Sequence, residues 1–329
     1  GRGGLHLHGL DLPLDVQGAI IETESLRAYD PAENPEQRPQ EILQETIEKI
    51  LDKIEESHRP VLSPGNGVRL AGAIREFHEL VDVLGVPVVT GMSSVDALES
   101  AHPYFVGRSG GTGTRPGNFA LQNSDVLLSI GNRQGFAQTG FQYQDWARES
   151  NPILNDIDEN ELKKPNLHVS LPVVGDAGEL IRGLLAEAKK RGADKGHPLF
   201  KGEDWRKQCL LWKEKYPAVT EKHYETLEEE CTNIYAFYGE LSKAMKENET
   251  LMVSVGTSRV AGSQAFQVKK GQRFITNPNT ASMGFCLPAA TGIAVAQPGK
   301  AVVCVTGEGS LQMNIQEMQT ILQNRLPVK

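Results

Sequence analysis

The sequence predicts an α/β protein built from two domains, each a doubly wound parallel sheet. Short apolar runs rich in β-branched residues alternate with segments whose apolar residues recur at helical spacing. Several of the runs end in glycine turns. Strands that alternate with helices form a parallel sheet with helices packed on it. The length of 329 residues suits two domains of ordinary size.

The first complete domain is predicted over residues 41–192. It follows a polar segment at 23–40 with three prolines, Pro31, Pro35 and Pro39, which indicates a linker. The spacing predicts helices over 41–57, 71–84 and 177–190, and strands over 60–67, 86–90, 124–131, 152–158 and 167–174. This pattern is typical of a Rossmann-like unit, although the Gly-x-Gly-x-x-Gly fingerprint is absent from it.

A charged segment at 193–232 separates this domain from the last one. Trp205, Trp212 and Tyr216 recur in it at helical spacing, so we expect a helical connector that packs its aromatic rings and carries no chemistry. The last domain, 233–329, begins with a predicted helix at 233–246 and a strand at 251–255 that leads into a turn containing Gly256, Thr257 and Ser258.

The final stretch carries the clearest chemical signal. An apolar run at 302–306 ends in Gly307-Glu308-Gly309-Ser310, and a helix-like segment follows at 311–329. Strand, tight turn and helix place backbone N–H groups against a phosphate. A carboxylate between the two glycines is placed where a metal could bridge to that phosphate. A plain turn without a ligand would show the same pattern.

Composition argues against several classes of partner. The net charge is −8 with no basic block, which disfavours nucleic acid and anionic membrane surfaces. No apolar run reaches the roughly 18 residues of a membrane span, and the first residues lack the apolar core of a signal peptide. Four cysteines without a Cys-x-x-Cys pair indicate reduced thiols, so we expect a cytoplasmic protein.

Three stretches resemble, in the same order, the thiamine-diphosphate enzymes, and most closely the large catalytic subunit of the acetolactate synthase group. Residues 107–114 and 117–131 resemble the central domain of that family. The family's Ser-Met-Gly-x-x-Leu-Pro-Ala-Ala signature is similar to Ser282-Met-Gly-Phe-Cys-Leu-Pro-Ala-Ala290. Its Gly-Asp-Gly-Ser turn, the helix after it and the Leu-Pro-Val-Lys that opens the next strand are similar to residues 307–329.

The resemblance implies thiamine diphosphate and Mg²⁺ as cofactors and a homodimer or tetramer whose active site spans the interface. It implies decarboxylation of a pyruvate-type 2-oxo acid followed by C–C bond formation, as in branched-chain amino acid biosynthesis. Met283 would hold the cofactor bent, the carbonyl of Ala281 would accept from its aminopyrimidine, and Glu308 would bind the metal. The implied cofactor-binding residues are Gly256, Thr257, Ser258, Ala281, Ser282, Met283, Gly307, Glu308, Gly309 and Ser310.

The resemblance also implies that the chain is a fragment cut at both ends. Leu10-Asp-Leu-Pro-Leu-Asp-Val-Gln17 resembles the end of the family's N-terminal, pyrimidine-binding domain, so residues 1–22 would be its remnant. His6 and His8, which alternate there, fit exposed strand residues better than metal ligands. The family's activating glutamate belongs to that N-terminal domain. We therefore expect no catalytic residue in this chain and no activity from it alone.

Two departures from the family leave alternatives open. Arg133-Gln-Gly-Phe-Ala137 replaces the Arg-Phe-Asp-Asp-Arg of flavin-containing synthases, which weakens the expectation of bound FAD. Glu308 stands where the family has aspartate. The alternatives are a thiamine-diphosphate lyase or hydrolase acting on sugar-derived or diketone substrates, and a non-catalytic relative that only binds the cofactor.

Overall fold

The structure, a computed structural model, describes residues 17–27, 41–225 and 231–329. Residues 1–38 and 39–329 form separate units. In the first unit the described element is a 3₁₀ turn, η1 (Thr23–Ser25). The predicted family remnant up to residue 16, His6, His8 and the three linker prolines lie outside the described residues.

The first sheet has six parallel strands in the order β3-β2-β1-β4-β5-β6. This is the strand order of a Rossmann-type doubly wound sheet, so the predicted fold class is confirmed. The strands are β1 (Pro60–Pro64), β2 (Val88–Thr90), β3 (Phe105–Arg108), β4 (Val126–Ile130), β5 (Asn151–Asp156) and β6 (Leu171–Val174).

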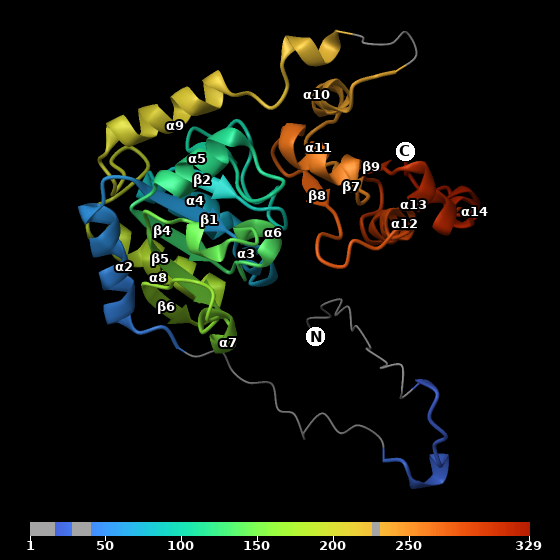
Figure 1. Ribbon diagram of the computed structural model, residues 1–329, viewed down its shortest axis with the longest axis horizontal. Coiled ribbons are helices and arrows are strands. Elements are labelled where there is room, and N and C mark those ends of the chain that lie inside the picture. The colour runs from blue at the N-terminus through green and yellow to red at the C-terminus, as the bar shows by residue number, and fades with distance from the viewer. Residues whose placement is uncertain (1–16, 28–40, 226–230) are drawn as a thin grey trace. The chain divides into compact units, whose positions relative to one another are not determined.

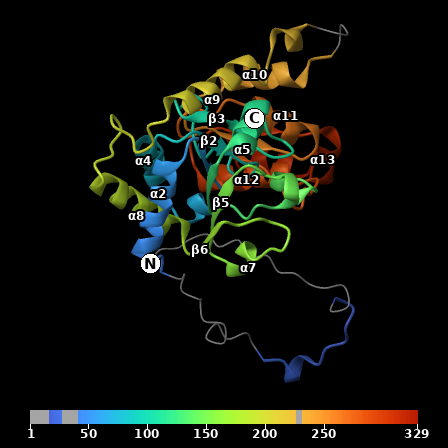
Figure 2. The ribbon, with the colours of Figure 1, turned by 60° about the vertical axis from the view of Figure 1, so that its left-hand side comes forward.

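Helices cover both faces of this sheet. Strands β1 to β4 are buried at every residue, which requires a layer on each side. Helices α2 (Gln44–Glu56), α4 (Ile74–Leu84) and α8 (Ala177–Lys190) pack on one another, and α5 (Arg115–Asn123) packs on β2 and β3 (Figures 1 and 2). Short helical turns complete the domain: α3 (Gly67–Leu70), α6 (Phe136–Thr139), η3 (Tyr143–Asp145) and α7 (Glu159–Leu162).

The connector forms one helix, α9 (Glu203–Lys215), followed by a 3₁₀ turn, η4 (Glu221–Tyr224). As expected, α9 packs its aromatic side chains. Trp205 is buried and its Nε1 donates to the Pro60 carbonyl at 2.9 Å. The rings of Trp212 and Tyr216 both meet Phe119 of α5 edge-on. Aromatic contacts therefore hold the helix against the first domain, together with hydrogen bonds from Lys213 to the Ser100 and Phe105 carbonyls.

The second sheet has three parallel strands in the order β8-β7-β9. They are β7 (Thr250–Val253), β8 (Arg273–Ile275) and β9 (Val302–Val305). The helices of this domain are α10 (Ile234–Ala244), α11 (Thr257–Ala265), α12 (Cys286–Ala296), α13 (Glu308–Met313) and α14 (Glu317–Gln323). Val328 forms a parallel bridge with Val302, so a further strand begins at the predicted Leu-Pro-Val-Lys.

Several elements differ from the prediction. The segment at 311–329 contains two short helices rather than one, and the first begins at Glu308, inside the predicted turn. The helix predicted from residue 71 begins at Ile74, because Gly72 before it has a φ of +66°. Strands β3 and β8 are too short to show a period, and α12 has apolar residues on all sides, so no periodic pattern predicts these elements.

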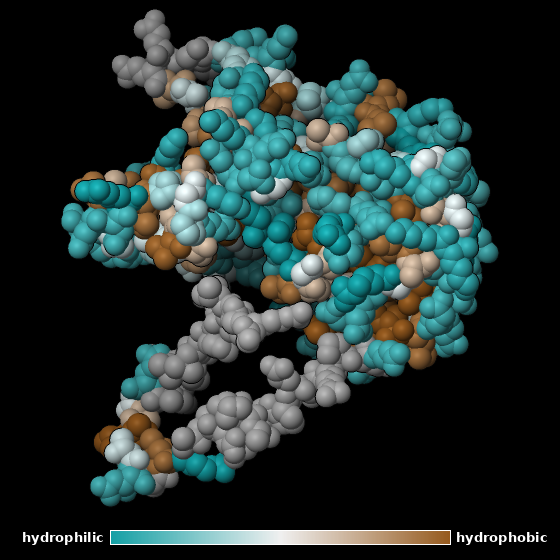
Figure 3. Space-filling model, turned by 180° about the vertical axis from the view of Figure 1, so that it is seen from behind, coloured by the Kyte–Doolittle hydropathy of each residue, from teal (hydrophilic) through white to brown (hydrophobic). Residues whose placement is uncertain are grey.

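The face drawn in Figure 3 is largely hydrophilic, with hydrophobic side chains in patches between. None of the helices in the described part of the chain combines the length and the apolar character that crossing a bilayer requires.

Candidate cofactor site

The three segments singled out in the last domain each follow a strand of the second sheet. Residues 254–258 follow β7, residues 276–284 follow β8, and Thr306 to Ser310 follow β9. Because the strands are parallel neighbours, their carboxyl ends lie at the same edge of the sheet. Open α/β sheets bind ligands at that edge.

Ser310 ties the three segments together. Its Oγ accepts a hydrogen bond from the Gly284 N–H at 2.9 Å and another from the Ser254 hydroxyl at 2.8 Å. All three residues are buried. The backbone N–H of Ser254 donates in turn to the Val305 carbonyl at 2.9 Å. One hydroxyl therefore links loops that are 26 and 56 residues apart from it in the chain.

Asn314 makes a second link between the loops. Its Nδ2 donates to the Gly284 carbonyl at 2.9 Å. Gly284 has a φ of +85°, and a Cβ there would lie 2.7 Å from Asn314 Nδ2 and 2.8 Å from Met313 Cβ. Only glycine fits this position. Ser254 and Asn314 were not among the predicted site residues. The one sequence signal that could have found either of them is the small hydroxyl side chain of Ser254 at the end of a predicted strand.

Met283 lies over the turn that follows β9. Its methyl carbon is 3.1 Å from the point where a Cβ on Gly309 would stand. The side chain is 50% exposed and belongs to none of the buried hydrophobic clusters of the described residues. A methionine that only filled the core would be buried. Met283 therefore has a free surface at the same edge of the sheet as the glycine turns.

Ala281 has an unusual backbone conformation. Its φ is +50°, in the left-handed region that residues with a Cβ rarely adopt. Such strain is often found at ligand sites, where the surrounding structure imposes it. Ala281 and Ser282 are exposed, and the Ser282 hydroxyl donates to Thr280 Oγ1 at 3.5 Å.

The turn after β7 is open to ligands and is held from behind. Gly256 has a φ of +75° and precedes the first residue of α11, Thr257, which is exposed. The Ser258 carbonyl accepts from the buried hydroxyl of Tyr238 at 2.8 Å. Burial raises the pKa of that phenol, and the nearby Cys286 thiol raises it further, so the hydroxyl stays a donor.

Space is available where a diphosphate would approach. No atom lies within 4 Å of the position that a Cβ would take on Gly256 or on Gly307. Glu308 is the first residue of α13 and is exposed. No group of three or more His, Cys, Asp or Glu residues able to hold a metal occurs among the described residues. A single carboxylate with phosphate oxygens is a common way to hold Mg²⁺, so Glu308 fits that metal.

Two thiols lie beneath the site. Cys286 Sγ and Cys304 Sγ are 3.1 Å apart, and both cysteines are free. The hydrogen bond to Cys304, together with burial, raises the pKa of Cys286. The same bond lowers the pKa of Cys304. Cys304 is therefore the more acidic thiol of the pair.

The first sheet has its own potential ligand site, where the strand order reverses between β1 and β4. There the loops after the two strands are in backbone contact. A Cβ on Gly65 would lie 2.1 Å from the Gly131 carbonyl oxygen, and one on Gly67 would lie 2.7 Å from Gly131 Cα. The turns after β1 and β4 therefore pack against each other through backbone atoms.

Comparison with known proteins agrees with this architecture. Residues 47–184 match the central domain of the thiamine pyrophosphate (thiamine diphosphate) enzymes, and residues 254–329 match their C-terminal, cofactor-binding domain. The two matches cover more than half of the chain and all three segments of the site. The chain belongs to the thiamine pyrophosphate enzyme family, which implies thiamine diphosphate as its cofactor.

Its similar relatives include acetolactate synthase large subunits. The isozyme 3 large subunit of Escherichia coli is 30% identical over 82% of this chain and 46% of that protein. Probable large subunits of Methanococcus aeolicus and Methanocaldococcus jannaschii are also 30% identical, over 84% and 97% of this chain. The chain spans about half the length of the curated relatives it matches.

Proposed function

We propose that this chain supplies the diphosphate- and metal-binding part of an acetolactate synthase-like active site. The enzyme would decarboxylate a pyruvate-type 2-oxo acid and join the remaining carbon unit to an acceptor. The observation that carries this proposal is the convergence of the three strand-end segments on Ser310. The names of the similar relatives support the choice of reaction.

We assign roles to the site residues as follows. Backbone N–H groups of Gly309 and Ser310 and the start of α11 bind the diphosphate. Glu308 binds Mg²⁺, which bridges to the phosphate oxygens. Met283 supports the ring system and the Ala281 carbonyl orients it, while Gly256 and Gly307 leave room for its approach. When bound, thiamine diphosphate supplies the carbon nucleophile that makes decarboxylation of a 2-oxo acid feasible.

We propose the domain limits predicted from the sequence: 1–22, a linker at 23–40, a central domain at 41–192, a connector at 193–232 and the cofactor domain at 233–329. We also propose a cytoplasmic homodimer or tetramer without nucleic-acid or membrane partners. Support for assembly comes from apolar side chains left exposed on the cofactor domain: Phe285, Val295, Met313, Met318 and Leu322. Solvent-exposed apolar side chains grouped in one region are typical of interfaces.

A second candidate is a lyase or hydrolase of the same family that acts on sugar-derived or diketone substrates. Residues 155–165, which resemble relatives associated with sugar pathways, and the departure from the synthases at 133–137 favour it. Phe136 and Phe141 there are exposed and stacked at 5.6 Å between ring centroids, and Arg133 pairs with Glu161 at 3.1 Å. A non-catalytic cofactor-binding relative would also account for Glu308.

The cofactor site is tested by titrating thiamine diphosphate with Mg²⁺ into the chain and measuring heat. Met283→Ala should weaken binding about tenfold, because it removes the support under the rings. Met318→Ala is the matched control, since Met318 is 53% exposed in the same domain but outside the site. Equal binding by both variants and the parent would contradict the role of Met283, and inorganic pyrophosphate should compete for the site.

The reaction is tested in the protein as the cell makes it, supplied with thiamine diphosphate and Mg²⁺. Pyruvate should give carbon dioxide and acetolactate. Hydrolysis of a cyclic diketone without pyruvate turnover would favour the second candidate. Cofactor binding without turnover of either substrate would favour the non-catalytic relative.

A further inference from the structure

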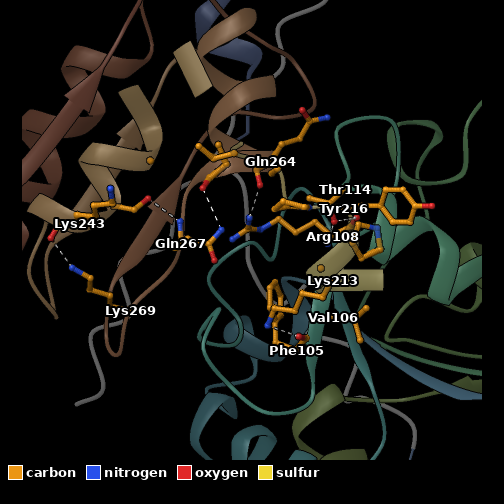
Figure 4. Close-up of a pocket in the computed structure, with 18 of the residues that line it drawn as sticks. Phe105, Val106, Arg108, Thr114, Lys213, Tyr216, Lys243, Gln264, Gln267 and Lys269 are labelled. Carbon is orange, nitrogen blue, oxygen red and sulfur yellow. Dashed lines mark hydrogen bonds between the residues drawn. The ribbon is translucent and has the colours of Figure 1, made fainter. Parts of the chain in front are cut away.

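A cavity of about 460 Å³ lies away from the cofactor site, between strand β3, the end of α9, α10 and the segment after α11 (Figure 4). None of the ten predicted site residues lines it. It is also distinct from the reversal point of the first sheet, because β3 is an edge strand. Its size falls within the usual range of small-molecule pockets.

The lining of the cavity is rich in cations. Four of the described residues that line it carry a positive charge: Arg108, Lys213, Lys243 and Lys269. None of the described lining residues is an aspartate or a glutamate. These four come from separate parts of the chain, the end of β3, α9, α10 and the segment after α11. Most of the remaining surface is apolar or aromatic, including Val106, Pro116, Tyr216, Ala218 and Tyr224.

Arg108 is a buried guanidinium that has no counterion among the described residues. It is 2% exposed and forms no ion pair with a described carboxylate. Nη2 donates to the Phe266 carbonyl at 2.8 Å and Nη1 to the Gln264 carbonyl at 3.4 Å. Its Nε is buried and has no partner among the described residues. Carbonyl groups satisfy donors but bring no negative charge, so the buried charge is uncompensated.

The carboxylate that acts on Arg108 from a distance is already shared. Asp96 pairs with Arg69 at 3.2 Å and with Arg273 at 2.7 Å. The single negative charge of Asp96 is therefore already shared by Arg69 and Arg273. Burial lowers the pKa of Arg108 to about 10, and the pull of Asp96 only partly opposes this.

Lys213 adds a second charge at the same place. Its Nζ donates to the carbonyls of Ser100 at 2.9 Å and Phe105 at 2.8 Å. Lys213 Nζ and the Arg108 guanidinium both contact the Phe105 ring, at 5.1 and 5.6 Å from its centroid. Burial lowers the pKa of Lys213, and the charge of Arg108 lowers it further. Figure 4 shows the two side chains beside each other at the cavity.

We propose that this cavity binds an organic phosphate ester of nucleotide size, with the phosphate at Lys213 Nζ and the buried charge of Arg108 behind it. A phosphate monoester carries nearly two negative charges at neutral pH and so balances two cations, whereas a carboxylate balances one. The ester's apolar or aromatic body lies along Tyr216, Pro116 and Val106. Lys243 and Lys269 stand on the α10 side of the cavity, where they attract the anion as it enters.

The experiment measures binding of adenosine 5′-monophosphate to the chain by calorimetry. Adenosine, which lacks the charge, and inorganic phosphate, which lacks the body, should each bind at least about tenfold more weakly. Lys213→Gln should lose about tenfold in affinity. Lys207→Gln should not, since Lys207 is on the same helix, exposed and paired with Glu203 at 3.1 Å outside the cavity. Affinity for the nucleotide should fall with added salt.

Several outcomes would overturn the proposal. They are no nucleotide binding at millimolar concentration, equal binding of adenosine, tighter binding of pyruvate, and equal affinity of the Lys213→Gln and Lys207→Gln variants. If Lys213→Gln does not fold by circular dichroism, Lys269→Gln should lower affinity in its place, because Lys269 lines the cavity and its Nζ donates to carbonyls rather than to a described carboxylate. Met283→Ala, which changes the proposed cofactor site and lies outside the cavity lining, should leave nucleotide affinity unchanged, so this test is independent of the proposed cofactor site.

Discussion

At the scale of single residues, we expect Glu308 to set how tightly a metal is held. It replaces the family's aspartate and extends its carboxylate by one methylene, about 1.5 Å. Mg²⁺ tolerates misplaced ligands poorly. The backbone groups that would bind the diphosphate are unaffected by the change. Metal binding should therefore be weakened without loss of the diphosphate site.

Titration of thiamine diphosphate binding against Mg²⁺ tests this. We expect the parent to need a higher Mg²⁺ concentration for thiamine diphosphate binding than Glu308→Asp. Binding by Glu308→Ala should no longer depend on Mg²⁺. The change in required Mg²⁺ concentration is the quantity to compare. If Glu308→Ala binds as well as the parent at every Mg²⁺ concentration, Glu308 is only a turn residue.

Ala281 offers a test of the strained backbone in the second loop. Glycine adopts a φ of +50° without steric cost, so Ala281→Gly should stabilise the fold by about 0.5–1 kcal/mol. The control is Ala289→Gly within α12, which should cost about 1 kcal/mol because it loosens a helix interior. Urea unfolding gives both values. Destabilisation by Ala281→Gly would show that the methyl group has a packing role.

At the scale of elements, the Ser310 link holds the strand-end loops together. Ser310→Ala leaves the buried Gly284 N–H without its acceptor, which should cost about 1–3 kcal/mol of unfolding free energy. Ser282→Ala changes an exposed serine of the same region and should stay within about 0.5 kcal/mol. Urea unfolding is again the measurement. Equal effects of the two changes would mean that the loops are held by other contacts.

Helices α2 and α8 are joined by charges that predict a pH dependence. Glu187 of α8 accepts from Lys190 at 3.1 Å, from Arg191 at 3.4 Å and from Gln44 of α2 at 3.1 Å. Hydrogen bonding to Lys190, and then to Arg191, holds the pKa of Glu187 below its ordinary value of 4.5. Arg191 also pairs with Asp52 of α2 at 2.7 Å.

The pKa of Glu187 is lower in the folded state than in the unfolded state, where it is near 4.5. Glu187 therefore stabilises the fold at pH values above 4.5. This contribution is lost as the pH falls through the pKa of the folded state. Glu187→Gln should lower stability at pH 7 and flatten its decline below about pH 4.5. Unfolding free energies measured across this range give the slope. Glu179→Gln changes an exposed residue on the same helix and should leave the slope of stability against pH unchanged. If Glu187→Gln also keeps the parent's slope, Glu187 is not the source of the pH dependence.

At the scale of the whole molecule, we propose that the protein carries little or no FAD. The acidic pair and second arginine of the flavin-containing synthases are absent at 133–137. Purified protein should therefore release far less than one FAD per chain on denaturation. A yellow protein with near-stoichiometric flavin would contradict this.

Local patterns in the sequence were enough to predict the fold class and many of the elements. The predicted helix at 177–190 has the bounds of α8, and the strands predicted at 124–131 and 302–306 contain β4 and β9. These signals are local, since helical and strand periods depend on residues close together in the chain. The turn motif at 307–310 and the family resemblance were local in the same sense. Short or uniformly apolar elements such as β8 and α12 have no such period and were missed.

The tertiary structure decided which of these motifs meet. Ser254 and Ser310 are 56 residues apart, and nothing near either one in the sequence shows that their hydroxyls touch. The connector expected to carry no chemistry brings Lys213 beside Arg108, although more than 100 residues separate them. Contacts of this kind depend on how the strands and helices pack, and packing joins residues that local patterns cannot relate.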